Sequence, residues 1–222
     1  MIICLGEVLT KQELAQMQST LEREAFLDGA RTAGWHARSV KHNLQVQASA
    51  PVAALQLEVV DALRRHPVFA LAARPRRIAP VLFSRYEQGM EYGDHVDDAI
   101  MGGDDMLRTD IAVTLFLSKP EDYVGGELTL DTADGEQQFK LPAGSAVLYP
   151  ASTLHRVETV TQGHRLAAVT WVQSLIRDAQ KRELLFDLDS VRRRLFEREG
   201  SSADFNLLSK GLANLIRMWA DL

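Results

Sequence analysis

The chain has 222 residues, of which 46% are hydrophobic and 25% charged, and its formal net charge is −5. This balance is typical of a folded globular protein and excludes an intrinsically disordered chain. The acidic total argues against a nucleic-acid-binding surface, where a basic face is expected, and no apolar run approaches the roughly 20 residues of a membrane helix.

The cysteine content and the first residues indicate the compartment. The single cysteine, Cys4, excludes an internal disulfide and favours an intracellular protein. The start, MIICLGEVLTKQEL, has no basic n-region and too short an apolar run for a secretory signal peptide. We therefore expect a soluble, cytoplasmic protein with neither a membrane nor a nucleic-acid partner.

Residues 1–78 are predicted to form an N-terminal helical support region. Thr10 to Glu13 match a capping box, and apolar residues follow at helical spacing, namely Leu14, Met17 and Leu21. Pro51 suits the first turn of a second helix, whose apolar face would carry Val52, Leu55 and Val59. The pair His66-Pro67 should end that helix, and the intervening GWHARSVKHNLQVQ could hold short strands.

Residues 79–177 change to a strand pattern. Short runs rich in Val, Leu, Thr and aromatic residues, such as DIAVTLFLS and RLAAVTWVQS, are separated by turn sequences such as DTADGE, PAG and TQG. Many short strands at close spacing indicate an all-β sandwich or barrel. The lack of helix-length segments between them argues against a βαβ architecture.

Residues 178–222 return to a helical pattern and are predicted to form a C-terminal helical region. Two apolar stripes are present, the first made of Leu184, Leu188, Val191 and Leu195, the second of Phe205, Leu208, Leu212, Leu215, Trp219 and Leu222. Packing on the same domain is the simpler interpretation, and a subunit interface that makes a homo-oligomer is the alternative. The run RRR at 192–194 is predicted to lie on a solvated helix face.

The stretch YEQGMEYGDHVDDA, residues 86–99, carries a candidate metal site. On a strand, the side chains of His95 and Asp97 would point to the same face and could hold one metal ion together. Taken alone, an H-x-D pattern is weak evidence, because a surface turn in an acid-rich loop explains it equally well. A third ligand elsewhere in the chain would favour the metal site.

Two histidines in the strand-rich region compete for that third position. His155 follows the strand-like GSAVLYP, whereas His164 precedes Arg165 at the start of an apolar strand. Alternation puts His164 and Arg165 on opposite faces, so only one of them can face a cavity. An arginine turned into a sandwich needs an anionic partner, although Arg165 could also reach water at the strand end. The functional interpretation makes Arg165 a clamp for an anion, His164 a solvated residue and His155 the third ligand.

The combination is more specific than its parts. Two histidines and one carboxylate form a facial triad that leaves open positions on Fe(II). The order H-x-D…H…R on a β-sandwich resembles the Fe(II)/2-oxoglutarate dioxygenases of the prolyl 4-hydroxylase type. YEQGMEYGDHVD is similar to that family's Y-x-x-G-x-x-Y-x-x-H-x-D segment, and VGGELTL to its G-G-x-L strand. The stretches RTDIAVTLFLSKPEDYVGGEL and LPAGSAVLYPASTLHRVETVTQGHRLAAVTWVQSLIRD resemble the bacterial PKHD-type hydroxylases in particular.

The resemblance implies an α+β fold with a double-stranded β-helix (jelly-roll) core at 79–177, N-terminal helices and a C-terminal helical extension. It implies hydroxylation of an unactivated C–H bond with Fe(II), 2-oxoglutarate and O2, succinate and CO2 as coproducts, and ascorbate as a further cofactor. It assigns the metal to three residues, His95, Asp97 and His155. It also assigns the distal carboxylate of 2-oxoglutarate to Arg165 and a further hydrogen bond to Tyr86, for which core packing is the alternative.

The sequence departs from the family pattern at one point and leaves the substrate open. Some relatives carry a tyrosine that holds the cosubstrate on the strand TLFLS, where Leu115 and Phe116 cannot donate a hydrogen bond. Tyr86 or an unidentified residue must then complete the polar contacts. A peptidyl residue, an amino acid or a siderophore-related small molecule would each suit the chemistry. The segment AGWHARSVKHNLQV is either a surface loop or the mouth of the site, with polar candidates Lys41, Asn43 and Gln45.

Three other functions are less well supported. A cupin-like protein that binds a metal or small ligand without oxygenase activity is the main alternative, but all four motif residues are present. A nucleic-acid demethylase of the same superfamily would carry R-x5-R, whereas residue 171 is tryptophan. A zinc hydrolase of the H-E-x-x-H kind lacks its pattern. We therefore expect a 2-oxoglutarate-dependent dioxygenase.

Overall fold

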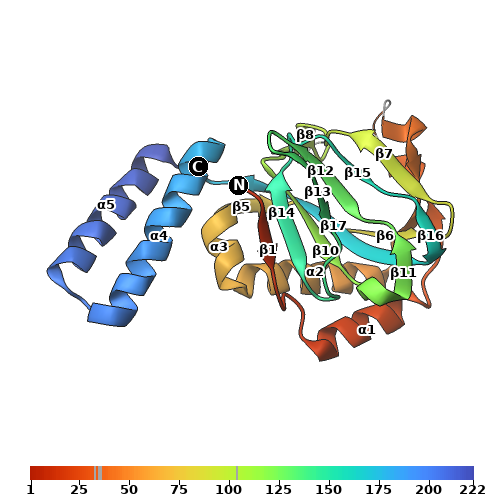
Figure 1. Cartoon of the computed structure of the whole chain (residues 1–222), viewed down its shortest axis with the longest axis horizontal. Coiled ribbons are helices and arrows are strands. Elements are labelled where there is room, and N and C mark those ends of the chain that lie inside the picture. Colours follow the sequence, from red (N-terminus) through yellow and green to blue (C-terminus); the bar gives the residue numbers. More distant parts are fainter. Residues whose placement is uncertain (33, 35–36, 104) are drawn as a thin grey trace.

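The computed structural model describes the chain except residues 33, 35–36 and 104. Figure 1 shows a β-sandwich, helices packed along one side of it, and a pair of helices that extends away from it. The helices are α1 (Lys11–Leu21), α2 (Ala50–Arg65), α3 (Pro67–Ala73), α4 (Ala179–Glu199) and α5 (Ala203–Trp219), with short 3₁₀ turns at η1 (Gly29–Thr32), η2 (Ala37–Ser39) and η3 (Pro120–Asp122). Among the described helices, none combines the length and the apolar character needed to cross a bilayer.

The larger sheet has eight strands, all paired antiparallel. Its order is β1 (Ile3–Leu5), β14 (Ala146–Pro150), β10 (Ile111–Phe116), β17 (Arg165–Ser174), β6 (Leu82–Tyr86), β4 (Leu44–Val46) and β2 (Phe26–Asp28), and β5 (Pro75–Ile78) pairs with the far end of β17. The longest strand, β17, lies at the centre between β10 and β6, and most of its residues are buried.

The smaller sheet has five strands, also antiparallel. Its order is β13 (Gly135–Phe139), β12 (Leu128–Thr132), β15 (His155–Val157), β7 (Glu91–His95) and β3 (Lys41–His42). Two small ribbons complete the strands, β11 (Tyr123–Gly125) with β16 (Val160–Gly163) and β8 (Ile100–Met101) with β9 (Leu107–Arg108). This antiparallel sandwich with helices before and after it confirms the α+β jelly-roll prediction.

Alternation along the central strands separates two cores. All six residues of β10 are buried, because Val113 and Leu115 pack toward the helices while Ala112 and Phe116 face the space between the sheets. A strand covered on both faces reads as a continuous apolar run, which is why DIAVTLFLS is recognisable in the sequence. The helices thus cover the outer face of the large sheet, and the inner face is left to form a pocket.

The N-terminal helices begin and end where the sequence predicts. Thr10 caps α1 in a full capping box with Glu13, and Pro51 lies in the first turn of α2 behind the cap residue Ser49. His66 ends α2 and at the same time caps α3. Residues 1–78 also contribute β1 to β5, strands of two to four residues, of which β3 and β4 lie in the segment GWHARSVKHNLQVQ, where short strands were expected.

The C-terminal helices form a hairpin beside the sandwich (Figure 1). Its base is closed by an antiparallel bridge between Ile176 and Ala220. The predicted stripe on α5 does face α4, with Leu212 buried, although Leu222 lies beyond the helix and is exposed. The predicted stripe on α4 is wrong in part, because Leu185 is buried and Leu184 exposed.

Candidate metal centre

A pocket opens between the two sheets, and about 90 Å³ of it can be occupied by the centre of a water-sized molecule. Its wall includes all five site residues predicted from the sequence, which are Tyr86, His95, Asp97, His155 and Arg165. The fold therefore brings together residues that are up to 79 positions apart in the chain.

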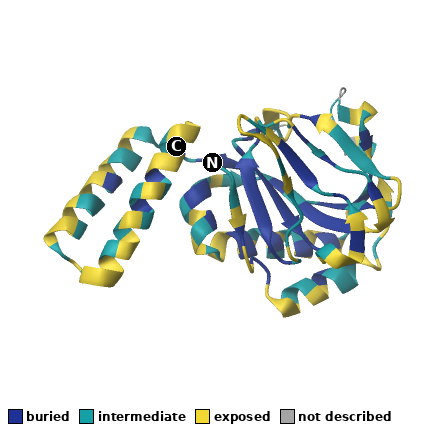
Figure 2. Ribbon diagram, in the orientation of Figure 1, coloured by how far each residue is buried: buried dark blue, intermediate teal, exposed yellow. Residues whose placement is uncertain are grey.

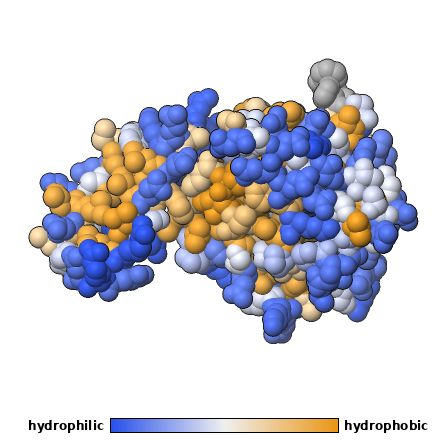
Figure 3. Space-filling model, viewed as in Figure 1, coloured by the Kyte–Doolittle hydropathy of each residue, from blue (hydrophilic) through white to orange (hydrophobic). Residues whose placement is uncertain are grey.

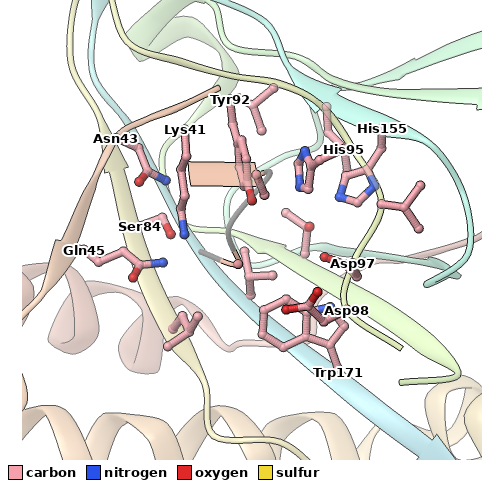
Figure 4. A pocket seen from close by; sticks show the side chains of 18 of the residues that line it. Lys41, Asn43, Gln45, Ser84, Tyr92, His95, Asp97, Asp98, His155 and Trp171 are labelled. Atoms are coloured by element: carbon pink, nitrogen blue, oxygen red, sulfur yellow. The ribbon is translucent and has the colours of Figure 1, made fainter. Parts of the chain in front are cut away.

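Two neighbouring strands of the smaller sheet position the histidines. His95 ends β7 and His155 begins β15, and the two residues lie directly opposite each other in the antiparallel ladder. Their ring centroids are 4.2 Å apart. With Asp97 they form a group whose ligand atoms all lie within 4.8 Å of one another. Figure 4 shows both imidazoles and the carboxylate on the same side of the pocket.

The segment His95-Val96-Asp97 is not a continuous strand. β7 ends at His95, so Asp97 reaches the site from the turn that follows and not by strand alternation. Val96, which strand alternation would turn away from the face shared by His95 and Asp97, lines the pocket, as does Asp98. Asp94 does lie outside the pocket, where it pairs with Arg156 at 3.5 Å.

The hydrogen bonds of the three side chains prepare them for a metal ion. The Nδ1 atoms of His95 and His155 donate to the carbonyls of Gly93 at 2.8 Å and Thr153 at 2.9 Å. A carbonyl can only accept, so each ring keeps its Nε2 lone pair for a ligand. One carboxylate oxygen of Asp97 is buried without a hydrogen-bond partner. Two imidazoles and one unsatisfied carboxylate fit a divalent transition metal.

The protonation states of His95 and Asp97 also favour a bound metal cation. Burial, with a contribution from the neighbouring His155, lowers the pKa of His95 to about 3, although its bond to Gly93 acts in the opposite direction. His95 is therefore neutral near pH 7, the form that binds metals. Burial raises the pKa of Asp97, whereas the His155 charge and the Trp171 indole N–H lower it. A metal cation would relieve the burial of this carboxylate.

Arg165 begins β17 opposite Tyr86 and is only 1% exposed. Its guanidinium carbon lies 5.1 Å from the ring centroid of Tyr86 and 5.5 Å from that of Phe116. Its Nε has no hydrogen-bond partner. The side chain passes so close to Gly126, where φ is +66°, that a Cβ there would lie 3.2 Å from the Arg165 Cδ. The second glycine of the G-G-x-L pattern thus leaves room for Arg165 and, at still shorter distances, for the Val160 and Tyr123 side chains.

Sequence reasoning missed three polar groups near Arg165. The Tyr149 and Thr114 side chains line the pocket from β14 and β10, and Tyr123 contributes a buried hydroxyl with no hydrogen-bond partner. Burial raises the pKa of both tyrosines, while the Arg165 charge lowers it. The sequence did contain a signal for Tyr149, because it lies two residues after Val147 in the strand SAVLYP and so shares its inward face.

The polar candidates Lys41, Asn43 and Gln45 also line the pocket. Lys41 lies over the ring of Tyr92 at 5.2 Å, and Tyr92 stacks on His95 with ring centroids 3.5 Å apart. Together with Gly34 and Ala37, these residues make part of the segment AGWHARSVKHNLQV a wall of the site. Residues 33 and 35–36 of the segment lie outside the described residues.

Comparison with known proteins extends these observations. Residues 81–173 match the family model of the 2OG-Fe(II) oxygenase superfamily, and residues 178–221 match that of the PKHD-type hydroxylase C-terminal domain. A PKHD-type hydroxylase from Acaryochloris marina is 56% identical over 222 residues, and one from Synechococcus elongatus is 53% identical over 223 residues. Both alignments cover 100% of this chain and 100% of the relative.

Solved structures share the fold at low sequence identity. A prolyl-4-hydroxylase from Pseudomonas putida superposes with a TM-score of 0.52 at 18% identity, covering 78% of this chain and 92% of its own. HygX from Streptomyces hygroscopicus, solved with nickel, 2-oxoglutarate and hygromycin B, gives a TM-score of 0.54 at 15% identity, covering 79% and 84%. At these identities the similarity is one of fold.

Proposed function

Because the chain belongs to the PKHD-type hydroxylases of the 2OG-Fe(II) oxygenase superfamily, we propose that it hydroxylates an unactivated C–H bond of a peptide or small molecule in the pocket between its sheets. Family membership makes it a 2-oxoglutarate-dependent hydroxylase that uses Fe(II). The reacting bond, the substrate and the role of each residue are the proposal.

One observation carries the assignment of the metal. The ligand atoms of His95, Asp97 and His155 lie within 4.8 Å of one another, both Nδ1 atoms are engaged with backbone carbonyls, and one buried carboxylate oxygen of Asp97 has no hydrogen-bond partner. A buried polar group without a partner destabilises the fold by about 1–3 kcal/mol. A cation held by the carboxylate and the two Nε2 atoms best explains this convergence.

The protein's own residues would then divide the work. Three protein ligands leave open positions on a six-coordinate metal, which suits binding of a chelating cosubstrate and O2. When bound, Fe(II) and 2-oxoglutarate supply the activation of O2, with succinate and CO2 as coproducts. The sandwich walls hold the substrate near the metal and exclude bulk water.

The cosubstrate would lie between the metal ligands and Arg165. A buried guanidinium presents a rigid pair of donors that matches a carboxylate, so we assign the distal carboxylate of 2-oxoglutarate to Arg165. Tyr86 lies opposite it in the ladder and is assigned a hydrogen bond to the same molecule. The Tyr149 and Tyr123 hydroxyls are candidates for the contact that the strand TLFLS does not supply.

Anaerobic titration with Fe(II) and then 2-oxoglutarate tests the proposal. The wild-type protein should develop a weak visible metal-to-ligand charge-transfer band, and O2 should then release succinate. Arg165→Met should weaken 2-oxoglutarate binding by roughly 10- to 100-fold because a charge-assisted pair is lost. The exposed Arg194→Met is the matched control and should behave as wild type. No band in the wild-type protein would refute the proposed function, and a band without succinate release would favour a cupin-like binding protein.

Two further expectations go with this function. Ascorbate, implied by the family resemblance, is proposed to sustain repeated turnover, so its omission should lower the yield of succinate. Self-association through the C-terminal helices stays a prediction. The large exposed apolar side chains of Leu207 and Met218 on α5 are where it can be tested.

A further inference from the structure

The turn that carries Asp97, residues 96–99, is the least regular part of the metal site. His95 and His155 are held by strand pairing in the smaller sheet, whereas residues 96–98 lie outside the strands. Figure 4 shows Asp97 with Asp98 beside it, near the indole of Trp171. The carboxylate can meet a metal ion held by the two imidazoles only while this turn keeps one conformation. The backbone contacts of the turn therefore decide where the third ligand lies.

One residue behind the pocket wall holds two consecutive carbonyls of this turn. Thr109 lies between β9 and β10, is 9% exposed and does not itself line the pocket. Its side-chain hydroxyl donates a hydrogen bond to the Asp98 carbonyl at 2.6 Å, and its backbone N–H donates to the Ala99 carbonyl at 3.0 Å. Any residue except proline could make the second contact, but the first needs the hydroxyl.

Thr109 is itself fixed, because its two neighbours in the chain are bound to the central strand of the larger sheet. The Asp110 backbone N–H donates to the Val172 carbonyl at 3.0 Å, and the Asp110 carboxylate accepts from the Ser174 N–H at 2.8 Å. Arg108 donates to both carboxylate oxygens of Asp110, at 2.7 and 3.0 Å. Val172 and Ser174 belong to β17. The position of Thr109 is therefore set by the larger sheet.

The metal ligands consequently depend on both sheets. The two histidines come from neighbouring strands of the smaller sheet, and the turn of Asp97 is bound through Thr109 to the larger one. A functional site tolerates displacements of only about 0.5 Å in its side chains. The outer contacts that orient metal ligands are typically worth about 10- to 100-fold in metal affinity.

We propose that Thr109 is a positioning residue of the metal centre. It acts through its hydrogen bond to the Asp98 carbonyl and so places the neighbouring Asp97 carboxylate beside the two imidazoles. The inference rests on the proposed function, because it concerns the same metal site. The alternative is that Thr109 stabilises the connection between β9 and β10 without any effect on the metal.

Metal binding tests this inference without substrate or turnover. Full-length protein freed of metal by a chelator is titrated with Co(II), whose visible absorption depends on the number and kind of its ligands. Thr109→Val replaces the hydroxyl by a methyl group of similar size and should lower the Co(II) affinity by roughly 10-fold, with an altered absorption band at saturation. Thr109→Ser keeps the hydroxyl and should bind Co(II) within about threefold of the wild type.

Two further comparisons isolate the hydroxyl. Thr109→Ala and Thr109→Ser differ only by that group, so the alanine variant should show the lower affinity even if the valine variant does not fold. Thr132→Val is the matched control, because the Thr132 hydroxyl also donates to a backbone carbonyl, that of Gly135 at 2.7 Å, between β12 and β13 and outside the pocket. The control should change the Co(II) affinity by no more than about twofold.

A double-mutant cycle shows whether Thr109 acts through Asp97. Ni(II) is the probe here, because it binds more tightly than Co(II) and its binding is easier to measure without the carboxylate. Thr109→Val should lower the Ni(II) affinity by roughly 10-fold in the wild-type background and by less than about twofold in the Asp97→Ala background. Equal losses in both backgrounds would make the effect a general loss of structure and overturn the inference.

The outcomes separate this inference from the proposed function. A wild-type protein that gives no charge-transfer band with Fe(II) and 2-oxoglutarate refutes the function. With that band present, a Thr109→Val variant that binds Co(II) as the wild type does overturns the inference and leaves the function intact. The same holds if Thr109→Ser loses as much affinity as Thr109→Ala, because the hydroxyl would then play no part.

Discussion

The jelly roll and the C-terminal hairpin are built on different kinds of contact. Both faces of the large sheet are covered by apolar side chains, which form one core under the helices and another between the sheets. The hairpin has only three buried apolar residues, Ile176, Leu185 and Leu212. Figure 2 shows the contrast as a dark, buried sheet beside a mostly exposed pair of helices, and Figure 3 shows apolar surface on the hairpin and where it meets the sandwich.

Charged groups on α4 supplement the small apolar cluster of the hairpin. Asp189 is 3% exposed and pairs with Arg74 at 3.3 Å and Arg192 at 2.6 Å. Arg182 is also buried and donates to two backbone carbonyls, those of Ile176 and Arg177. Specific polar contacts hold an element in one place only while every partner is present. The hairpin should therefore be easier to detach than any part of the jelly roll.

The difference matters for function because the pocket takes its described wall entirely from residues 34–171. Apolar packing on both sides of β17 fixes the backbone from which Arg165 and Trp171 project. The hairpin lies outside this arrangement. We expect changes in the pocket to abolish chemistry without unfolding, and changes in the hairpin to loosen structure without affecting the metal.

The largest effect is expected at the metal centre. His155→Ala should lower succinate release by more than about 100-fold, because even the outer partners of metal ligands are worth 10- to 100-fold. Circular dichroism should show an intact fold, since the loss is at the pocket wall. His164→Ala is the matched control, because this histidine is exposed in the connection between β16 and β17. Equal losses in the two variants would remove His155 from the proposed metal site.

Much of the jelly roll could be predicted because its long strands carry strong local signals. β10, β14 and β17 are continuous apolar runs bounded by turns, and buried strands of five or more residues read that way. β1 to β4 have two or three residues each and are defined by their partners, not by their own sequence. β3 and β4 do lie in the segment where short strands were expected, but no local pattern could have fixed their bounds.

The site was predictable only as far as motif spacing and family resemblance reach. His95, Asp97, His155 and Arg165 do share one pocket, although the turn that delivers Asp97 and the inward position of Val96 contradicted simple alternation. The close approach of the Asn43 amide to Gly29 could not be foreseen, because the two residues are 14 positions apart in the chain. The predicted apolar stripe on α4 was wrong in part for a similar reason, since the buried face of α4 carries Arg182 and Asp189 beside Leu185.

The next largest effect is expected from Asp189→Asn, which should destabilise the hairpin and leave the jelly roll intact. Removing the charge leaves Arg74 and Arg192 without their partner, and breaking a buried ion pair costs about 3–5 kcal/mol. Because Arg192 is partly exposed, we expect the lower end of that range. Hydrogen exchange should accelerate across α4 and α5 while β10 and β17 stay protected. If the charge-transfer band is lost along with the hairpin, the two regions are coupled and the contrast fails.

A smaller effect is expected from the hairpin's own apolar contact. Leu212→Ala removes its most central side chain on α5 and should cost about 2–3 kcal/mol of local stability, at the low end for core truncations because the hairpin can relax around the cavity. The control is Leu207→Ala on the same helix, where the side chain is 68% exposed, and the change should be within about 0.5 kcal/mol. Exchange rates of the α5 amides measure both. Equal effects would show that α5 buries no specific face.

The smallest effect belongs to the jelly roll and depends on pH. In protein freed of metal by a chelator, burial lowers the pKa of His95 from its ordinary 6.5 to about 3. Between these values the unfolded chain carries a proton on this histidine that the folded chain does not. The free energy of unfolding should therefore fall as the pH falls through this window, by at most about 1.4 kcal/mol per pH unit.

Asp97, whose pKa burial raises, acts in the opposite direction, so the comparison is with His95→Asn, which cannot titrate. Urea unfolding at pH 6.5, 5.5 and 4.5, chosen as steps across that window, should show a shallower loss of stability in His95→Asn than in the wild type. Asp189→Asn should keep the wild-type slope, because the histidine lies in the region whose packing the hairpin does not determine.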